Sequence, residues 1–112
     1  MDQKRAKELA IIATRIRLAG LDAVHTAASG HIGGSLSVAD ILAVLYFEKM
    51  RVDPKDSKNP DRDRFVLSKG HCTPALYPTL AQRGFFPEED LLTLRQIGSH
   101  LQGHPNMNLT PG

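Results

Sequence analysis

The sequence is poor in cysteine and aromatic residues, with a single cysteine, no tryptophan and 5% aromatic residues. One cysteine excludes an internal disulfide framework and a cysteine-based zinc site. It also suits a reducing compartment, so we expect the protein in the cytoplasm. The longest uninterrupted apolar run, residues 41–47, is far shorter than the ~20 residues that cross a membrane. We therefore expect no transmembrane segment, and the N-terminus carries no pattern typical of export.

Neither sign of charge dominates the chain. It has 14 Lys plus Arg against 12 Asp plus Glu, and the two signs alternate along it, so nucleic-acid binding is not indicated. The 41% hydrophobic and 23% charged composition is typical of a globular domain. At 112 residues the chain is one small domain at most, and we expect no sizeable enclosed active site from it alone.

Two helices are predicted in the first half of the chain. Apolar residues recur at spacings of three and four over residues 4–27, which predicts a long amphipathic helix. Gly20 inside it indicates either a close neighbour or a local weakness. A second helix is predicted over residues 38–50, with Ser37 as N-cap and Asp40 in the capping-box position. Its central run is apolar all round, so this helix should be mostly buried.

The second half alternates short elements with loops. Residues 64–68 form a short apolar run between turn residues, which predicts one buried strand of a parallel sheet. Thr73 and Pro74 predict a helix start, and Gly84 its end. Pro78 argues for a kink or a later start. A short helix should follow Pro87, and the remaining residues to the C-terminus should be loop.

Three of the five histidines stand where chemistry is expected. His31 is surrounded by glycines that let the backbone approach a ligand. His71 follows the predicted strand and precedes a helix N-terminus, where free N–H groups favour an anion such as a diphosphate. His104 lies between glycine and proline, which makes it a candidate for a fixed donor to a substrate. Against these stand the ordinary roles of loop histidines, which are mostly structural.

The other candidates are weaker. His100 and His104 stand four apart like two metal ligands on one helix face, but Gly103 and Pro105 disfavour a helix there, so a protein zinc site is not predicted. His25 is interpreted as structural and Lys69 as solvated. The sequence also lacks a phosphate-binding P-loop, a dinucleotide fingerprint and a Gly-x-Ser-x-Gly elbow.

Three segments together resemble the transketolase family: SGHIGGSL at 29–36, RFVLSKGH at 64–71 and GHP at 103–105. They have the order and intervals of the histidine-bearing loops of that family. The form GGSLS with SKGH is closest to the N-terminal subunit of split bacterial or archaeal transketolases. Ile32, where the family often has proline, is a departure.

The resemblance implies an α/β fold of the thiamine-diphosphate-binding type, of which residues 1–112 would be an incomplete, helix-rich N-terminal portion. It implies a transferase that uses thiamine diphosphate to move a two-carbon ketol unit from a ketose phosphate to an aldose phosphate, as in the pentose phosphate pathway. By match, His71 would contact the cofactor near its diphosphate. His31 and His104 would contact substrate hydroxyls as catalytic groups.

The resemblance also implies what this chain lacks. The family binds Mg²⁺ through a Gly-Asp-Gly segment and a later asparagine, and neither is present. We therefore expect no metal ligand in this chain, with the metal ligands beyond residue 112. The chain alone should be inactive, and should act with a C-terminal transketolase subunit or domain in an oligomer.

Two alternatives remain open at this point. One keeps the cofactor and changes the substrate, as in a related ketol-transfer enzyme of a specialised pathway. The other is a non-catalytic interaction module, in which the histidines are relics and the apolar second helix pairs with a partner. The motifs do not decide between these and a transketolase.

Overall fold

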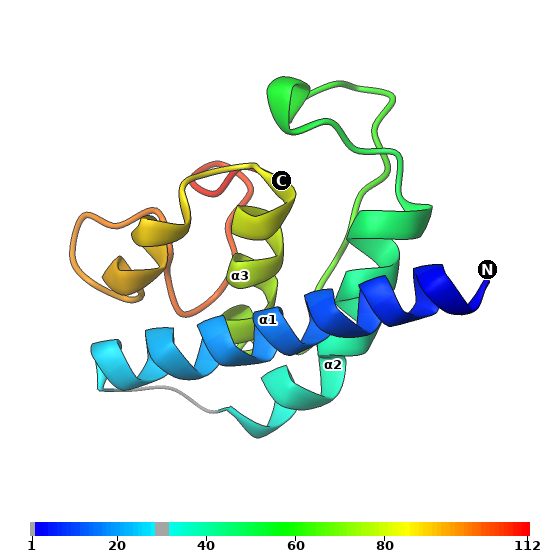
Figure 1. Cartoon of the computed structure of the whole chain (residues 1–112). Helices are drawn as coiled ribbons and strands as arrows, with labels where there is room; N and C mark the ends of the chain where they lie inside the picture. The colour runs from blue at the N-terminus through cyan, green and yellow to red at the C-terminus, as the bar shows by residue number, and fades with distance from the viewer. Residues whose placement is uncertain (1, 29–31) are drawn as a thin grey trace.

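Three α-helices organise the protein. The computed structural model describes residues 2–28 and 32–112, with α1 at Gln3–Ala27, α2 at Gly33–Val44 and α3 at Thr73–Arg83. Figure 1 shows α1 running across both α2 and α3. This long helix confirms the prediction for residues 4–27. Its buried face packs on the other helices and comprises Leu9, Ala13, Ile16, Gly20 and Ala23.

Gly20 marks a close approach between α1 and α3. A β-carbon at Gly20 would overlap the backbone carbonyl oxygen of Pro74. In α3 that carbonyl would normally accept from the amide four residues later, but this residue is Pro78, which has no N–H. The helix nevertheless continues unbroken through Pro78 to Arg83, and Gly84 at φ 106° ends it. Of the two interpretations of Gly20, the structure therefore favours the close neighbour.

The start of α2 differs from the prediction. The helix begins at Gly33, inside the glycine segment, and not at Val38. Ser37 is therefore not the N-cap; its hydroxyl donates to the Gly34 carbonyl oxygen at 2.9 Å. Asp40 makes no capping box and instead pairs with Arg17 of α1 at 2.7 Å. The prediction failed because glycines, although poor helix formers, adopt helical φ where tertiary packing favours it.

Burial of the second helical segment is one-sided. Leu42 is 0% exposed and Tyr46 is 2% exposed, but Ile41 is 57% exposed. After α2 the chain continues as a π-helical turn, η1, at Leu45–Lys49. The prediction of a mostly buried helix therefore holds for one face only.

The predicted strand is the main correction. Residues 64–68 run as an extended connection from η2, a 3-10 turn at Pro54–Asp56, down to α3 (Figure 1), but the described residues contain no β-strand. Phe65 and Leu67 pack against the core, whereas Val66 is 84% exposed. This alternation is typical of a strand, but a strand needs a neighbour to pair with, and none of the described residues supplies one. The α/β class therefore stays a prediction.

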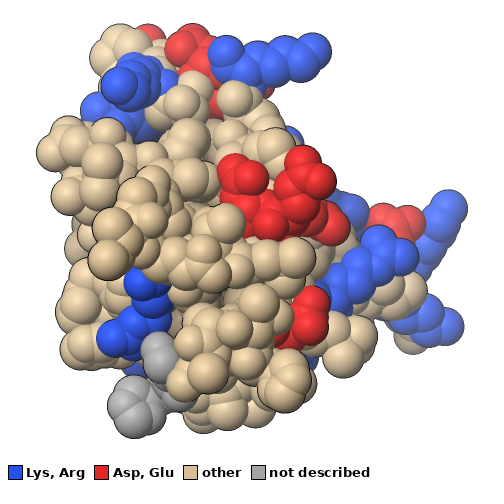
Figure 2. Space-filling model, turned by 90° about the vertical axis from the view of Figure 1, so that its left-hand side faces the viewer, with Lys and Arg blue, Asp and Glu red and all other residues tan. Residues whose placement is uncertain are grey.

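The C-terminal third follows the prediction more closely. Its predicted short helix is present as a 3-10 helix, η3, at Glu88–Thr93. Residues 96–112 form turns around the fully buried Leu101. Within the described ranges, no helix has both the length and the apolar character needed to span a membrane. Figure 2 shows one face of the molecule, where acidic groups lie between basic ones.

Candidate functional site

His71 and His104 lie against each other, although 33 positions separate them in the sequence. Their Nε2 atoms are 2.9 Å apart, and the ring centroids are 4.0 Å apart at an interplanar angle of 67°. In such a contact one imidazole nitrogen carries the proton and donates, while the other accepts. Both residues are exposed. The structure therefore presents two polar ring systems side by side at the surface.

Residues of α3 hold His104 in place. The Tyr77 hydroxyl donates to the Gln102 carbonyl oxygen at 2.5 Å and lies 3.3 Å from the His104 carbonyl oxygen. The Thr73 hydroxyl donates to the Gly103 carbonyl oxygen at 3.4 Å. These two side chains, one helical turn apart, fix the segment on either side of the His104 ring.

Tyr77 is well suited to this role because it stays neutral. Burial raises its pKa to about 12, so its O–H remains a donor at physiological pH. Sequence reasoning missed both Thr73 and Tyr77. Their i, i+4 spacing, which places both hydroxyls on one helix face, was the signal that could have indicated them.

Gly70 lies directly under the His104 ring. A β-carbon at this position would overlap the imidazole, including its Nδ1 atom. The glycine of the SKGH motif therefore allows the backbone before His71 to approach the ring of His104. This close approach is what brings the two histidines together.

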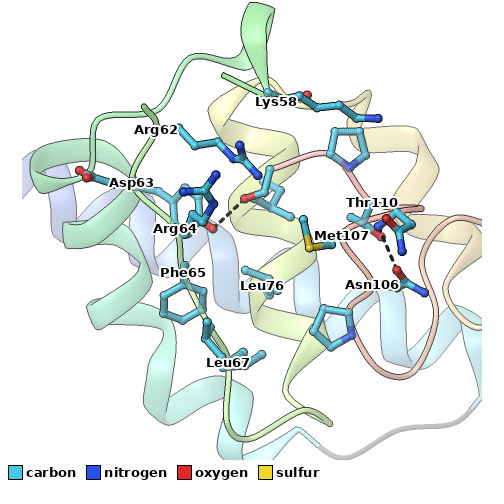
Figure 3. Close-up of a pocket in the computed structure, with 18 of the residues that line it drawn as sticks. Lys58, Arg62, Asp63, Arg64, Phe65, Leu67, Leu76, Asn106, Met107 and Thr110 are labelled. Atoms are coloured by element: carbon cyan, nitrogen blue, oxygen red, sulfur yellow. Dashed lines mark hydrogen bonds between the residues drawn. The ribbon is translucent and has the colours of Figure 1, made fainter. Parts of the chain in front are cut away.

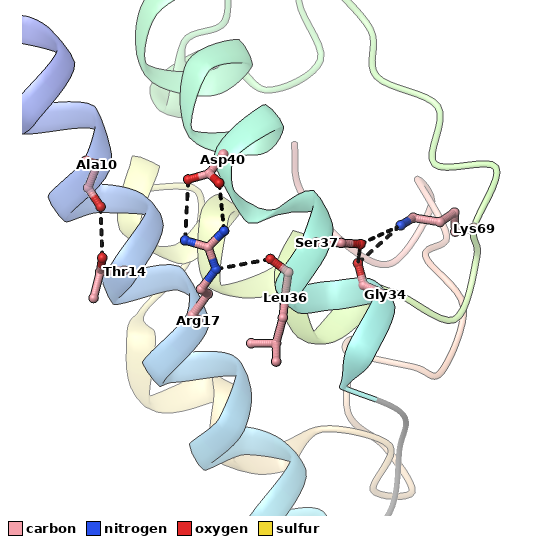
Figure 4. Close-up of polar contacts among 8 residues, drawn as sticks. All are labelled: Ala10, Thr14, Arg17, Gly34, Leu36, Ser37, Asp40 and Lys69. Atoms are coloured by element: carbon pink, nitrogen blue, oxygen red, sulfur yellow. Dashed lines mark hydrogen bonds and ion pairs between the residues drawn. The ribbon is translucent and has the colours of Figure 1, made fainter.

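The N-terminal end of α2 joins the same region. Figure 4 shows Lys69 reaching the start of α2, where its Nζ donates to the Gly34 carbonyl oxygen and to the Ser37 hydroxyl, each at 3.2 Å. A β-carbon at Gly34 would lie 2.7 Å from the Cys72 sulfur. Gly34 thus packs on the turn that carries His71, and Lys69, interpreted from sequence as merely solvated, links this turn to the start of α2.

A second polar contact fixes α2 against α1. Arg17 pairs with Asp40 and also donates from Nε to the Leu36 carbonyl oxygen at 3.0 Å (Figure 4). This carbonyl lies in the first turn of α2, so Arg17 helps to set the position of the start of this helix.

The remaining histidines lie elsewhere. His100 pairs with Asp90 through Nε2 at 3.0 Å, and its ring packs on Phe86, so it does not join His104 in a metal site. Within the described residues, no group of three or more His, Cys, Asp or Glu side chains could hold a metal. His25 is exposed near the end of α1. His31 lies outside the described residues, and its role stays a prediction.

A pocket of about 630 Å³ borders the histidine pair at Gly70 and His104. Figure 3 shows Arg64, Phe65 and Leu67 on one wall and Asn106 and Met107 on the other, with Leu76 of α3 between them. This volume lies within the usual range for small-molecule sites. Tyr46 at the pocket donates to the Gly112 carbonyl oxygen at 3.1 Å, and burial raises its pKa to about 12.

Comparison with known proteins identifies the class of domain. Residues 8–112 match the family model described as "Transketolase, thiamine diphosphate binding domain". The class is therefore that of a thiamine-diphosphate-binding domain. Transketolase of Pongo abelii is 48% identical over 104 residues, covering 93% of this chain and 17% of that protein. The chain accordingly belongs to the transketolase family.

Two further relatives extend the comparison. One subunit of the apulose-4-phosphate transketolase of Phocaeicola vulgatus is 50% identical over 92 residues, covering 82% of this chain and 32% of that polypeptide. The transketolase structure from Leishmania mexicana superposes with a TM-score of 0.88 at 38% identity, covering 93% of this chain and 16% of that chain. This chain thus spans about a sixth of the curated transketolases that it matches, and the relatives include a separate subunit.

The residues of this chain fit one end of the cofactor. Imidazole N–H groups are good donors to phosphate oxygens, and His71 stands just before the N-terminus of α3, a place that favours anions. Gly34 and Gly70 let the Cys72 sulfur and the His104 ring pack closely against this turn. The imidazole donor and the helix N-terminus suit the anionic diphosphate of thiamine diphosphate. For Mg²⁺, the described residues contain no group of three or more His, Cys, Asp or Glu side chains that could bind the ion.

Proposed function

We propose that this chain is the diphosphate-contacting part of a thiamine-diphosphate-dependent transketolase. With the polypeptide that completes the site, it would move a two-carbon ketol unit from a ketose phosphate to an aldose phosphate. The observation that carries this proposal is the 2.9 Å contact between His71 and His104. Two of the three histidines singled out by family resemblance thus meet beside a pocket.

Each residue would have the role that its position allows. His71, at the N-terminal side of α3, would donate to the cofactor diphosphate. His104, held by Tyr77 and Thr73, would contact a substrate hydroxyl. His31 would do the same, by resemblance alone. Lys69 would hold the start of α2 against the turn that carries His71, as a positioning residue.

Proton transfer is the chemistry these side chains can supply. When bound, thiamine diphosphate provides the electron sink for breaking the donor carbon–carbon bond. The histidines would hold or accept protons at ring nitrogens as substrate hydroxyls gain or lose them. Because the two Nε2 atoms face each other, the contact holds one proton between the rings. For Nε2 of His104 to meet a substrate hydroxyl, its contact with Nε2 of His71 would have to open.

The proposal requires a partner. We expect this partner to be a C-terminal transketolase subunit or domain, within an oligomeric assembly. The Mg²⁺ ligands should come from outside these 112 residues. We also expect a cytoplasmic location, because the single cysteine, Cys72, is buried and free. The chain alone should bind thiamine diphosphate with Mg²⁺ weakly and have no activity. Tight binding in isothermal titration by the chain alone would contradict the proposed incomplete site.

A specialised substrate is the second candidate. One relative is named for apulose 4-phosphate and another for 6-deoxy-6-sulfo-D-fructose, so the sugar of this chain is open within the ketol-transfer class. The reconstituted complex should therefore be assayed with xylulose 5-phosphate and with both of these sugars. The sugar with the highest kcat/KM identifies the substrate class; silence with all three favours a non-catalytic interaction module.

Variants of the reconstituted complex test the roles of the histidines. His71→Ala should weaken thiamine diphosphate binding by about tenfold or more, because an imidazole donor to phosphate is lost. His104→Ala should lower kcat by about 10²-fold, typical of the loss of an acid–base group, with a smaller effect on cofactor affinity. His25→Ala, which removes an exposed histidine from α1, serves as the matched control. Unchanged cofactor affinity in His71→Ala would overturn its proposed role.

A further inference from the structure

The extended segment at residues 64–68 is open to pairing with another strand. Among the described residues, no backbone–backbone hydrogen bond involves an amide or a carbonyl of this segment. Val66 is 84% exposed, and the pocket of about 630 Å³ opens beside Phe65 and Leu67 (Figure 3). Unpaired extended backbone is a ready template for strand addition. A strand that adds to it must also match its side chains.

The segment matches itself in one antiparallel register. In an antiparallel pair, residues that stand opposite each other point to the same side of the sheet. When Val66 stands opposite Val66 of a second copy, Phe65 stands opposite Leu67. Arg64 then stands opposite Ser68. Apolar side chains therefore meet apolar ones, and each arginine meets a neutral hydroxyl.

Neighbouring registers fit less well. Sliding one strand by one residue turns the core side of one copy to the outer side of the other. Sliding it by two residues keeps the sides matched, but places Phe65 opposite Lys69 in one direction and Arg64 opposite Val66 in the other. Of these registers, the one centred on Val66 alone pairs apolar residues with each other throughout.

We propose that two copies of this chain form a symmetric dimer in which their 64–68 segments pair antiparallel, with Val66 at the two-fold axis. Such an interface is isologous, so each contact away from the axis occurs twice. Phe65 and Leu67 already pack against the core of each copy. The segment is therefore held extended before it pairs, and little ordering is needed on association.

The dimer does not rest on the proposed enzyme function, since it uses the backbone of residues 64–68 and neither His71 nor His104. A completing polypeptide that pairs with the same segment would compete with the second copy. The isolated full chain is thus the species in which the dimer forms.

Disulfide crosslinking of the full chain tests the register. The Cα atoms of opposite residues lie about 4.5–5.5 Å apart, a separation that a disulfide spans, so Val66→Cys should form a covalent dimer under mild oxidation. Ser68→Cys is the matched control, because the two copies of residue 68 lie about 13 Å apart along the strands, too far for a disulfide. The parent chain, whose only cysteine, Cys72, is buried, controls for crosslinking through that thiol.

Charge at residue 68 provides an independent check by analytical ultracentrifugation. Because residue 68 stands opposite Arg64 twice in the dimer, Ser68→Lys should raise the dimer Kd by about threefold or more, and Ser68→Glu should lower it by a similar factor. The same two substitutions at Thr14, which is exposed on α1, control for the change in net charge. Circular dichroism checks that each variant is folded as the parent chain is.

Three results would overturn the proposed dimer. Val66→Cys would crosslink no faster than Ser68→Cys, the parent chain would be a monomer at all concentrations, or substitutions at Ser68 would act like those at Thr14. Because these experiments contain neither cofactor nor completing polypeptide, their failure leaves the proposed function intact. Failure of the cofactor experiments likewise leaves the dimer intact.

Discussion

At the scale of single residues, the absence of a side chain matters as much as its presence. Gly20 and Gly70 each allow an approach that a β-carbon would block, the first between α1 and α3 and the second between two turns. Neither has a positive φ. Their requirement for glycine therefore comes from packing and not from backbone conformation.

Gly20→Ala should destabilise the chain by about 1–3 kcal/mol, because the new methyl group overlaps the backbone carbonyl of Pro74 and α1 must shift. Gly33→Ala is the control. A β-carbon at Gly33 meets nothing within 4 Å among the described residues, so alanine in α2 should be neutral or stabilise by up to about 1 kcal/mol. Urea unfolding measures both; equal effects of the two substitutions would contradict the close approach.

Two buried tyrosines predict a loss of stability at alkaline pH. Burial raises the pKa of Tyr46 and of Tyr77 from 10.0 to about 12. The folded state then keeps protons that the unfolded state releases, so the stabilisation is complete below pH 10 and is lost as pH rises toward 12. The free energy of unfolding should fall by about 1.4 kcal/mol per pH unit per tyrosine in this window.

Unfolding measured from about pH 8 to about pH 12 checks this slope. Tyr46→Phe and Tyr77→Phe should each reduce it, because phenylalanine has no ionisable group. Tyr77→Phe should also cost about 1 kcal/mol at neutral pH through the lost bond to Gln102. A slope that is the same in both variants and in the parent would refute the assignment.

At the scale of elements, the structure follows the predicted helices closely, whereas the predicted strand is absent from the described residues. The periodicity of residues 4–27 and the signals at Pro74 and Gly84 are local, and α1 and α3 follow them closely. The start of α2 was missed because the residue at its N-cap position, Ile32, makes no capping hydrogen bond through its side chain. A strand also needs a second strand to pair with, and this partner cannot be read from the local sequence. The pattern at 64–68 therefore predicted an extended backbone correctly, but the described residues contain no strand that pairs with it.

Candidate site prediction had the same limit. Glycine-flanked histidines at 71 and 104 were visible in the sequence, yet nothing local indicated that their rings would touch. Thr73 and Tyr77 were missed because their role is to bind backbone carbonyls 25 to 30 residues away. Lys69 was underrated for a similar reason, since its partner atoms belong to α2.

Hydrogen exchange tests the unpaired segment. No hydrogen bond among the described residues involves the amides of residues 64–68, so these amides should exchange at nearly unprotected rates in the chain alone. Amides in the middle of α3, those of Tyr77, Thr79 and Leu80, should be protected. In the complex with the completing polypeptide, the amides of 64–68 should become protected if the α/β sheet forms. Protection in the isolated monomer, or none in the complex, would contradict this.

At the scale of the whole molecule, exposed apolar side chains predict self-association. The second helix contributes little to such a surface, because its residues Leu42 and Tyr46 are buried. Val66, 84% exposed on an unpaired extended segment, is the stronger cause. The chain should therefore associate with increasing concentration, and Val66→Lys should reduce the association by charging the edge.

Ile97→Lys is the matched control, since Ile97 is also fully exposed but lies in a turn. Analytical ultracentrifugation should show a larger reduction for Val66→Lys than for Ile97→Lys. Equal reductions would mean that general apolar exposure, and not the extended segment, drives association. A monomer at all concentrations would contradict the expectation altogether.

The attachment of both histidines to α3 has a mechanical consequence. His71 precedes this helix by two residues, and the backbone at His104 is tied to it by Thr73 and Tyr77. A tilt or slide of α3, for example when another polypeptide docks, would carry both rings along as one rigid body. The gap between their nitrogens would thus be conserved through movements that change the orientation of the pair toward everything else.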